Sequence, residues 1–296
     1  MKFVFAEYSD LWPEASRRAL EPILAHVPCF RYPQDHAEIA SARNPAGTIV
    51  IFDNGDIPDI MKIVGLGYEH CLQRQRPDFA SELLASSLMV TRPESFMKNP
   101  LPFFFTGFQA GKTVEEPHIT SSFIRAFDKG QILRRLDKFL AQNDRLQGVY
   151  DLCMQAADEL ITNAIFAAPI DSKGKPTNRE LARTRDVILP EGHKANFFCS
   201  VSSHRVVVGV EDTFGSFHKP HLLSHLENSF LRDQSVPRAA NAGGAGLGLH
   251  FVVENAANVY IYCEKRRRSL VAAGFLLEGL RANLAAYKHF HVSFGT

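Results

Sequence analysis

The stretch DLCMQAADELITNAIFAAP, residues 151–169, predicts the helix around which the C-terminal half of this chain is built. At about 100° per residue, an apolar stripe points one way and a mixed face points roughly the opposite way. The stripe contains Met154, Ile161 and Ile165, and the opposite face contains Leu152, Ala156, Glu159 and Asn163. A helix that packs on a sheet through this stripe would turn a carboxylate and a carboxamide, one turn apart, toward whatever lies on its other side.

Glu159 and Asn163 need polar partners on that side. Burying such groups without partners costs roughly 1–3 kcal/mol each, and more for a charge. From this stretch alone, two interpretations stay open. Both side chains bond to nearby backbone, or both face a polar ligand.

Length and composition indicate a globular protein of two domains. The chain has 296 residues, 45% of them hydrophobic and 22% charged, which is enough for two cores of ordinary size. The net charge of +1 gives no reason to expect nucleic acid as a partner.

The localisation signals favour the cytoplasm. No apolar run of about 20 residues predicts a membrane span, and the N-terminal MKFVFAEYSD meets acidic residues too early for a signal peptide. The five cysteines are scattered without CxxC spacing, so we expect reduced core thiols and neither a disulfide framework nor a metal site.

The first 110 residues alternate between strand and helix patterns, which predicts a small α/β domain. We expect strands at 2–6, 48–52, 87–90 and 102–106, a helix that starts near Asp10 and Pro13, and a helix at about 57–75. This order weakly resembles a response-regulator receiver domain. In that resemblance, Asp53 would accept phosphate, Thr91 would close the next strand, and Glu7 or Asp10 would supply acid.

One departure weakens the receiver resemblance. The basic residue expected after the last strand is missing from PFFFTGF, residues 102–108. We therefore favour a degenerate receiver-like or sensory domain at 1–110 without phosphotransfer. A linker is expected at 111–127, where Pro117 interrupts the chain and His118 is interpreted as an ordinary loop histidine.

The pattern from residue 128 onward predicts a second domain, 128–296. Two helices in series are expected first, and a polar segment at 169–194 reads as a long loop. Its basic residues either form a solvated surface or help to hold a phosphate. Two hairpins follow, with strands at 196–201 and 205–211 and then at 259–264 and 270–277. The basic run 265–268 fits the turn of the second hairpin.

Two further features lie between these hairpins. Asp212 ends a strand, and a glycine run from Gly243 to Gly248 leads into an apolar helix at 247–256. Glycines before a helix N-terminus let the backbone approach a phosphate closely, and the exposed N–H groups favour the anion.

Three boxes in this order, ELITNA, VEDTFGSF and GGAGLGL, resemble the GHKL ATPase superfamily. That superfamily contains histidine-kinase catalytic domains, DNA gyrase, MutL and the anti-sigma-factor serine kinases. The resemblance covers about residues 128–296. It implies a two-layer α/β sandwich of the Bergerat type, a mixed sheet with helices on one face that binds ATP and Mg²⁺.

The resemblance also implies roles for single residues. Glu159 is similar to the general base of the hydrolysing and serine-phosphorylating branches, and Asn163 to the magnesium ligand. Asp212 matches the acceptor of the adenine amino group, and Gly215 the glycine behind the base. The phosphate-cradling run is matched by Gly244, Gly246, Leu247 and Gly248, and residues 217–241 would form a lid.

Two departures limit what the resemblance implies. Phe214 stands where a small residue is common, which puts the shape of the adenine pocket in question. No two-helix hairpin with a phosphoacceptor histidine precedes the domain, so a full sensor histidine kinase is not expected.

We therefore expect an ATP- and magnesium-binding signalling or regulatory protein, a serine/threonine kinase of the anti-sigma-factor type. The alternatives are a nucleotide-dependent adaptor without turnover, and a histidine-kinase-like protein that acts on a partner. A protein partner or substrate is implied, and a homodimer would be ordinary for the superfamily.

Overall fold

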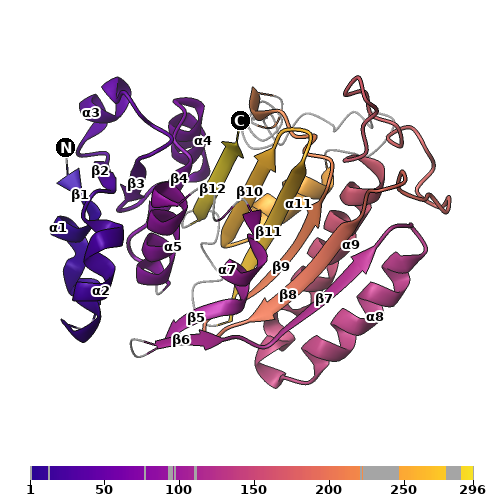
Figure 1. The fold of residues 1–296 in the computed structure, drawn as a ribbon. Helices are drawn as coiled ribbons and strands as arrows, with labels where there is room; N and C mark the ends of the chain where they lie inside the picture. The colour runs from indigo at the N-terminus through magenta and orange to yellow at the C-terminus, as the bar shows by residue number, and fades with distance from the viewer. Residues whose placement is uncertain are drawn as a thin grey trace, which may run out of the picture. The chain divides into compact units, whose positions relative to one another are not determined.

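The computed structural model describes residues 2–12, 14–76, 78–92, 96, 98–109, 112–220, 222, 247–277 and 288–295. The chain forms two compact units (Figure 1). The N-terminal unit comprises residues 1–117 and 280–293, and the C-terminal unit comprises residues 118–279 and 294–296. The chain therefore leaves the first unit, builds the second, and then returns.

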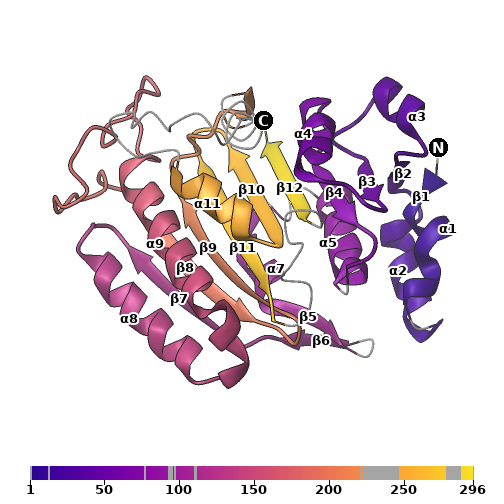
Figure 2. The same ribbon diagram turned by 180° about the vertical axis from the view of Figure 1, so that it is seen from behind.

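The C-terminal unit is an antiparallel sheet with helices on one face (Figure 2). Its strands are β7 His118–Phe123, β8 Ala195–Val201, β9 Arg205–Asp212, β10 Asn258–Glu264 and β11 Arg268–Leu276, in the order β10-β11-β9-β8-β7. Its helices are α8 Asp128–Ala141, the 3₁₀ helix η2 Asp144–Val149, α9 Tyr150–Phe166 and α11 Leu247–Asn255. The two predicted hairpins, the two helices in series, the helix after the glycines and the long loop at 169–194 are confirmed.

The ten-strand sheet of the chain is mixed, but no parallel pair is recorded among the described strands of this unit. Each pair recorded among its five strands is antiparallel. Tight turns join β8 to β9 and β10 to β11, and a tight hairpin connection can only link antiparallel strands. The parallel pairs of this mixed α/β protein lie in the N-terminal unit.

Helix α9 is buried over a wider arc than the stripe that we predicted. Ile161 and Ile165 are fully buried, as expected, but Met154 is only half-buried. Ala156, which we placed on the opposite face, is fully buried. The cause is that α9 contacts the helices α8, η2 and α11 as well as the strands β8, β9 and β11, so neighbours cover it on several sides. Glu159 and Asn163 stay half-buried at the margin of this arc.

The N-terminal unit is a smaller mixed sheet. Its strands are β1 Lys2–Phe3, β2 Pro28–Tyr32, β3 Ile49–Phe52, β4 His70–Gln73 and, as far as residue 293, β12 His289–Gly295, in the order β1-β2-β3-β4-β12. Strands β2, β3 and β4 are parallel, and β1 and β12 pair antiparallel with their neighbours β2 and β4. The helices are α1 Val4–Tyr8, η1 Ser9–Leu11, α2 Glu14–Leu24, α3 His36–Ser41, α4 Ile57–Gly65, α5 Phe79–Thr91 and α7 Leu101–Phe105, and β5 Thr106–Gln109 pairs with β6 Lys112–Glu115.

Several predictions for this unit were wrong. The strand expected at 2–6 ends at Phe3, and the strands expected at 87–90 and 102–106 lie mainly in α5 and α7. The helix expected at 57–75 stops at Gly65, and β4 follows it. Short apolar runs read alike as buried strand or buried helix, which explains these errors. The expected linker at 111–127 contains β6 and the edge strand β7, and His118 lies in β7.

The receiver-like arrangement is also not found. Thr91 is the last residue of helix α5, and its hydroxyl donates to the Ser87 carbonyl at 2.8 Å, so it closes no strand. Asp53 does follow β3, but it accepts hydrogen bonds from Arg31 at 3.0 Å and Gln34 at 2.9 Å. Burial by itself would raise the pKa of Asp53, but Arg31 and Gln34 lower it below its ordinary value. This carboxylate is therefore held by basic and amide groups rather than by acidic neighbours.

The cysteines and the helices both bear on predictions made from the composition. All five cysteines are buried free thiols, as predicted. Among the residues that the structure describes, none of the helices combines the length and apolar character that a membrane span requires.

Candidate functional site

Glu159 and Asn163 project from neighbouring turns of α9. The Glu159 side chain is 31% exposed, and its Oε2 atom is buried without a hydrogen bond to the described residues. The nearest recorded cation is the Arg183 guanidinium, whose Nη1 lies 3.9 Å from that oxygen. For the Asn163 side chain the described residues record no hydrogen bond, while its backbone carbonyl accepts from Ala167 and Ala168 at the helix end. Neither side chain is satisfied by nearby backbone, which was one of the two interpretations of this pair.

Asp212 is a buried carboxyl group at the end of β9. It pairs in register with Ala195 on β8 and Ser269 on β11, and only 6% of the residue is exposed. Its Oδ1 accepts the Phe214 backbone N–H at 2.8 Å. Burial raises the pKa of Asp212 to about 7, although the N–H groups of Phe214 and Gly215 oppose that rise. A donor presented to this carboxyl would therefore meet an acceptor that the fold itself leaves poorly solvated.

Phe214, the departure from the family pattern, is part of the packing. Its ring is 2% exposed and stacks on the His193 imidazole, with centroids 4.4 Å apart and planes 8° from parallel. The His193 Nδ1 also lies 3.0 Å from the Thr213 hydroxyl. The Phe214 ring therefore packs the end of the 169–194 loop against the end of strand β9.

Gly215 has a structural reason to be glycine. Its φ is +57°, and a Cβ there would lie 2.1 Å from the Glu264 carbonyl oxygen and 2.6 Å from the Arg266 nitrogen. The Arg266 N–H donates to the Gly215 carbonyl at 3.0 Å. The residue is therefore pressed against the turn between β10 and β11, and this contact accounts for glycine whether or not a base lies beside it.

The phosphate-cradling run is described only in part. Gly243, Gly244 and Gly246 lie outside the described residues, as does most of the expected lid at 217–241. Leu247 begins helix α11, and Gly248 is its second residue. Helix α11 packs beside α9 on the same face of the sheet (Figure 2), so its first turn and α9 belong to one layer.

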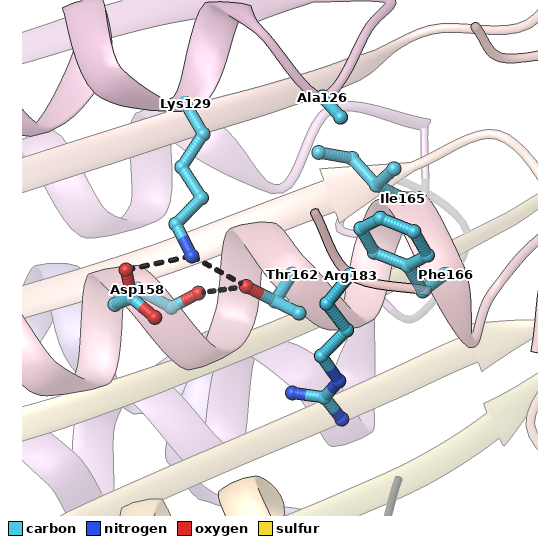
Figure 3. A pocket seen from close by; sticks show the side chains of 7 residues that line it. All are labelled: Ala126, Lys129, Asp158, Thr162, Ile165, Phe166 and Arg183. Atoms are coloured by element: carbon cyan, nitrogen blue, oxygen red, sulfur yellow. Dashed lines mark hydrogen bonds and ion pairs between the residues drawn. The ribbon is translucent and has the colours of Figure 1, made fainter. Parts of the chain in front are cut away.

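A pocket of about 110 Å³, which we did not predict from the sequence, lies along the other flank of α9 (Figure 3). It is lined by Ala126, Lys129, Asp158, Thr162, Ile165, Phe166 and Arg183. Lys129 bridges α8 to α9, because its Nζ lies 2.7 Å from the Asp158 carboxylate and donates to the Thr162 hydroxyl at 2.9 Å. The one-turn spacing of Asp158 and Thr162, each next to a site residue in sequence, was the available signal.

Arg183 connects this pocket to the predicted base. It comes from the basic loop at 169–194, lines the pocket, and reaches Glu159. This position gives the loop a specific contact on α9, which neither interpretation of its basic residues required.

Two of the described residues have the chemistry that the expected nucleotide would need. Asp212 offers a buried acceptor of the kind that an adenine amino group needs, and Asn163 offers an amide oxygen that suits Mg²⁺. Among the residues that the structure describes, no group of three His, Cys, Asp or Glu side chains could hold a metal ion. A magnesium ion here would therefore have to share Asn163 with oxygens of the nucleotide phosphates.

Comparison with known proteins adds no assignment. No protein-family model matches this chain, and no curated protein matches it either.

Proposed function

We propose that this chain is an ATP- and magnesium-binding signalling or regulatory protein, and that it acts as a serine/threonine kinase of the anti-sigma-factor type. We further infer that the C-terminal unit is a Bergerat-type fold of the GHKL superfamily. Two observations support this. The ELITNA and VEDTFGSF boxes and helix α11 fall in one unit, and helices cover one face of its sheet. The observation that carries the proposal is the buried, poorly solvated carboxyl of Asp212 at the end of β9.

Each residue has a distinct task in this proposal. The Asp212 carboxylate accepts the adenine amino group and fixes the base, and the Asn163 amide oxygen helps to hold the metal. The magnesium ion supplies charge neutralisation at the phosphates. The Oε2 atom of Glu159 takes the proton of a serine or threonine hydroxyl. Since that oxygen is buried, with the Arg183 Nη1 3.9 Å away, the side chains around it have to shift before a hydroxyl can reach it.

ATP binding by the purified full chain tests the site. Calorimetry with ATP and Mg²⁺ should give a saturable signal, and Asp212→Asn should weaken binding by roughly tenfold or more, because the amide presents an N–H where the carboxylate presents a lone pair. Asp53→Asn is the matched control, since it makes the same change at the strand end of the other unit and should leave affinity unchanged. Equal affinity in Asp212→Asn and wild type would remove the basis of the site.

One observation favours an adaptor that binds nucleotide without turnover. The Arg183 guanidinium occupies the neighbourhood of the oxygen that would act as base. Radiolabelled ATP, incubated with wild type, Glu159→Ala and Arg183→Gln, separates the two functions. A kinase or ATPase should lose turnover in Glu159→Ala and keep or gain it in Arg183→Gln. Nucleotide binding with no turnover in any of the three proteins would favour the adaptor.

A further inference from the structure

Strand β12 brings two histidines from the end of the chain into the buried interior of the N-terminal unit. It pairs antiparallel with β4, with His291 opposite His70 and Phe290 opposite Cys71. His289 and His291 are fully buried, and His70 is 2% exposed. Three imidazoles are therefore enclosed where a short two-residue register joins the final strand to this sheet.

His289 is held as a neutral ring by its neighbours. Its Nδ1 accepts the Gln73 backbone N–H at 3.1 Å, so that nitrogen carries no hydrogen. The hydrogen is then on Nε2, which lies 3.2 Å from the Asp78 carboxylate. Arg76 already pairs with both oxygens of Asp78, at 2.9 and 2.7 Å. Adding a proton to His289 would break the Gln73 bond and place a second cation beside Arg76.

His70 and His291 share one hydrogen between their facing nitrogens. The two Nδ1 atoms are 3.1 Å apart, and the His291 Nε2 lies 3.1 Å from the buried Glu82 carboxylate. One Nδ1 must donate and the other must accept, so both rings cannot carry a proton at that contact. The Ser86 hydroxyl lies at the outer limit of contact with the His291 ring, 3.5 Å away, and it donates to the Glu82 carbonyl.

The charged groups around these rings do not offer His70 a counter-ion. Arg76, Asp78 and Glu82 come from the turn after β4 and from helix α5, and the two carboxylates face His289 and His291. Glu69 precedes His70 and Lys288 precedes His289, and both are also buried. The only hydrogen-bond partner that the described residues record for His70 is the His291 ring.

The pKa values of His70, His289 and Asp78 are all lowered. Burial, followed by the His291 ring, holds the pKa of His70 well below its ordinary value of 6.5. Burial and then Arg76 lower the pKa of His289, against the opposing carboxylate of Asp78. Burial alone would raise the pKa of Asp78, but His289 and Arg76 lower it well below 3.8. A histidine with a lowered pKa contributes its stabilisation above its unfolded pKa and loses it as pH falls below that value.

We propose that strand β12 is a pH-sensitive latch of the N-terminal unit, closed while His70 and His289 are neutral and opened when they take up protons. Once β12 is released from β4, the His70 and His289 rings would titrate near the ordinary histidine pKa of about 6.5. At pH 5.5 each ring that stays neutral in the closed latch therefore weakens closure about tenfold. Both rings together would weaken it by roughly tenfold to hundredfold.

Hydrogen–deuterium exchange of the full chain at pH 7.5 and 5.5 tests the latch. After correction for intrinsic exchange rates, the protection of a peptide over residues 288–295 should fall by about tenfold to hundredfold on acidification. A peptide over β8 and β9, residues 195–212, should lose no protection, because it contains none of these rings and its Asp212, with a pKa raised to about 7, stabilises the folded unit as pH falls. Unchanged protection of β12, or an equal loss in both peptides, would overturn the proposal.

A double variant checks which groups carry the response. His70→Asn keeps a donor near the Nδ1 position and His289→Gln keeps one near Nε2, and neither side chain titrates. Their combination should respond to pH by less than about threefold, while His26→Asn, on an exposed histidine, should behave like the wild type. A full response in the double variant would contradict the assignment. If that variant does not fold, the wild-type comparison of the two peptides still decides.

Discussion

Replacing Asp212 with Asn should stabilise the ligand-free C-terminal unit at alkaline pH. The carboxyl is buried, and its pKa is raised from an ordinary 3.8 to about 7. A difference of about 3 units at roughly 1.4 kcal/mol per unit means that the ionised carboxylate costs about 4 kcal/mol. Because the folded chain binds the proton more tightly, this cost is absent below pH 3.8, grows with rising pH, and is complete above pH 7.

The amide removes the charge but brings a demand of its own. The Asn side-chain oxygen can still accept the Phe214 N–H that Oδ1 accepts now. Its NH₂ group, however, has to find acceptors in a buried site, which costs about 1–3 kcal/mol if they are incomplete. We therefore expect Asp212→Asn to raise the free energy of unfolding by about 1–3 kcal/mol at pH 8 and to lower it near pH 4.

Urea unfolding at pH 8 and pH 4, read by amide exchange of β9, measures this change. The single tryptophan, Trp12, lies in the N-terminal unit and reports there instead. Asp53→Asn is a control of opposite sign, because Arg31 and Gln34 lower the pKa of Asp53 against the effect of burial. The same free-energy change for Asp212→Asn at both pH values would refute the reasoning.

Three further predictions, one of them with a control variant, test the packing around the site by urea unfolding of the C-terminal unit. Gly215→Ala should destabilise the unit by more than about 3 kcal/mol, because the new Cβ would lie 2.1 Å from a backbone oxygen. Gly192→Ala is its control and should cost only about 1 kcal/mol, because Gly192 also has a positive φ but a Cβ there would meet no atom within 4 Å. Ile161→Ala should lower the free energy of unfolding by about 2–5 kcal/mol, since the side chain is fully buried in α9. Lys129→Met should change it by less than about 1 kcal/mol, because the Asp158 partner is 46% exposed, and a larger loss would show that this ion pair holds α8 to α9.

The hairpins of the C-terminal unit could be predicted because their signals are local. Each has two apolar runs separated by a few polar residues, 202–204 in one and 265–267 in the other. Turn chemistry and side-chain alternation are both properties of adjacent residues. The start of α11 after the glycine run could be predicted for the same reason.

The strands that pair over long sequence distances could not be found in this way. Strand β7 pairs with β8 across more than 70 residues, with His118 opposite Ser200, and β12 pairs with β4 across more than 200, with His291 opposite His70. Both strands contain polar residues, and no local pattern shows which distant strand each of them pairs with. Helix α5 was missed for the reverse reason, since polar Glu82, Ser86 and Ser87 are buried alongside its apolar residues.

The contacts that qualify the candidate site are equally non-local. The stacking of Phe214 on His193 and the approach of Arg183 to Glu159 each join the 169–194 loop to a distant element. The family resemblance points to positions, but it says nothing of the neighbours that occupy them in the folded chain. A glycine or glutamate at a motif position is therefore weaker support for a function than its surroundings are.

Asp212 and Gly215 both lie in the VEDTFGSF box, and they differ in what their surroundings say about function. The turn between β10 and β11 requires glycine at 215, so this residue would be needed in a chain that binds nothing. Asp212 accepts the Phe214 N–H and so helps to hold the backbone beside Gly215, but its ionised carboxyl makes the folded unit less stable above pH 7. An uncharged residue would pack there at less cost. A hydrogen bond from a ligand N–H, however, would replace part of the hydration that the carboxylate loses on burial. The case for nucleotide binding therefore depends on the aspartate that destabilises the fold and not on the glycine that the fold requires.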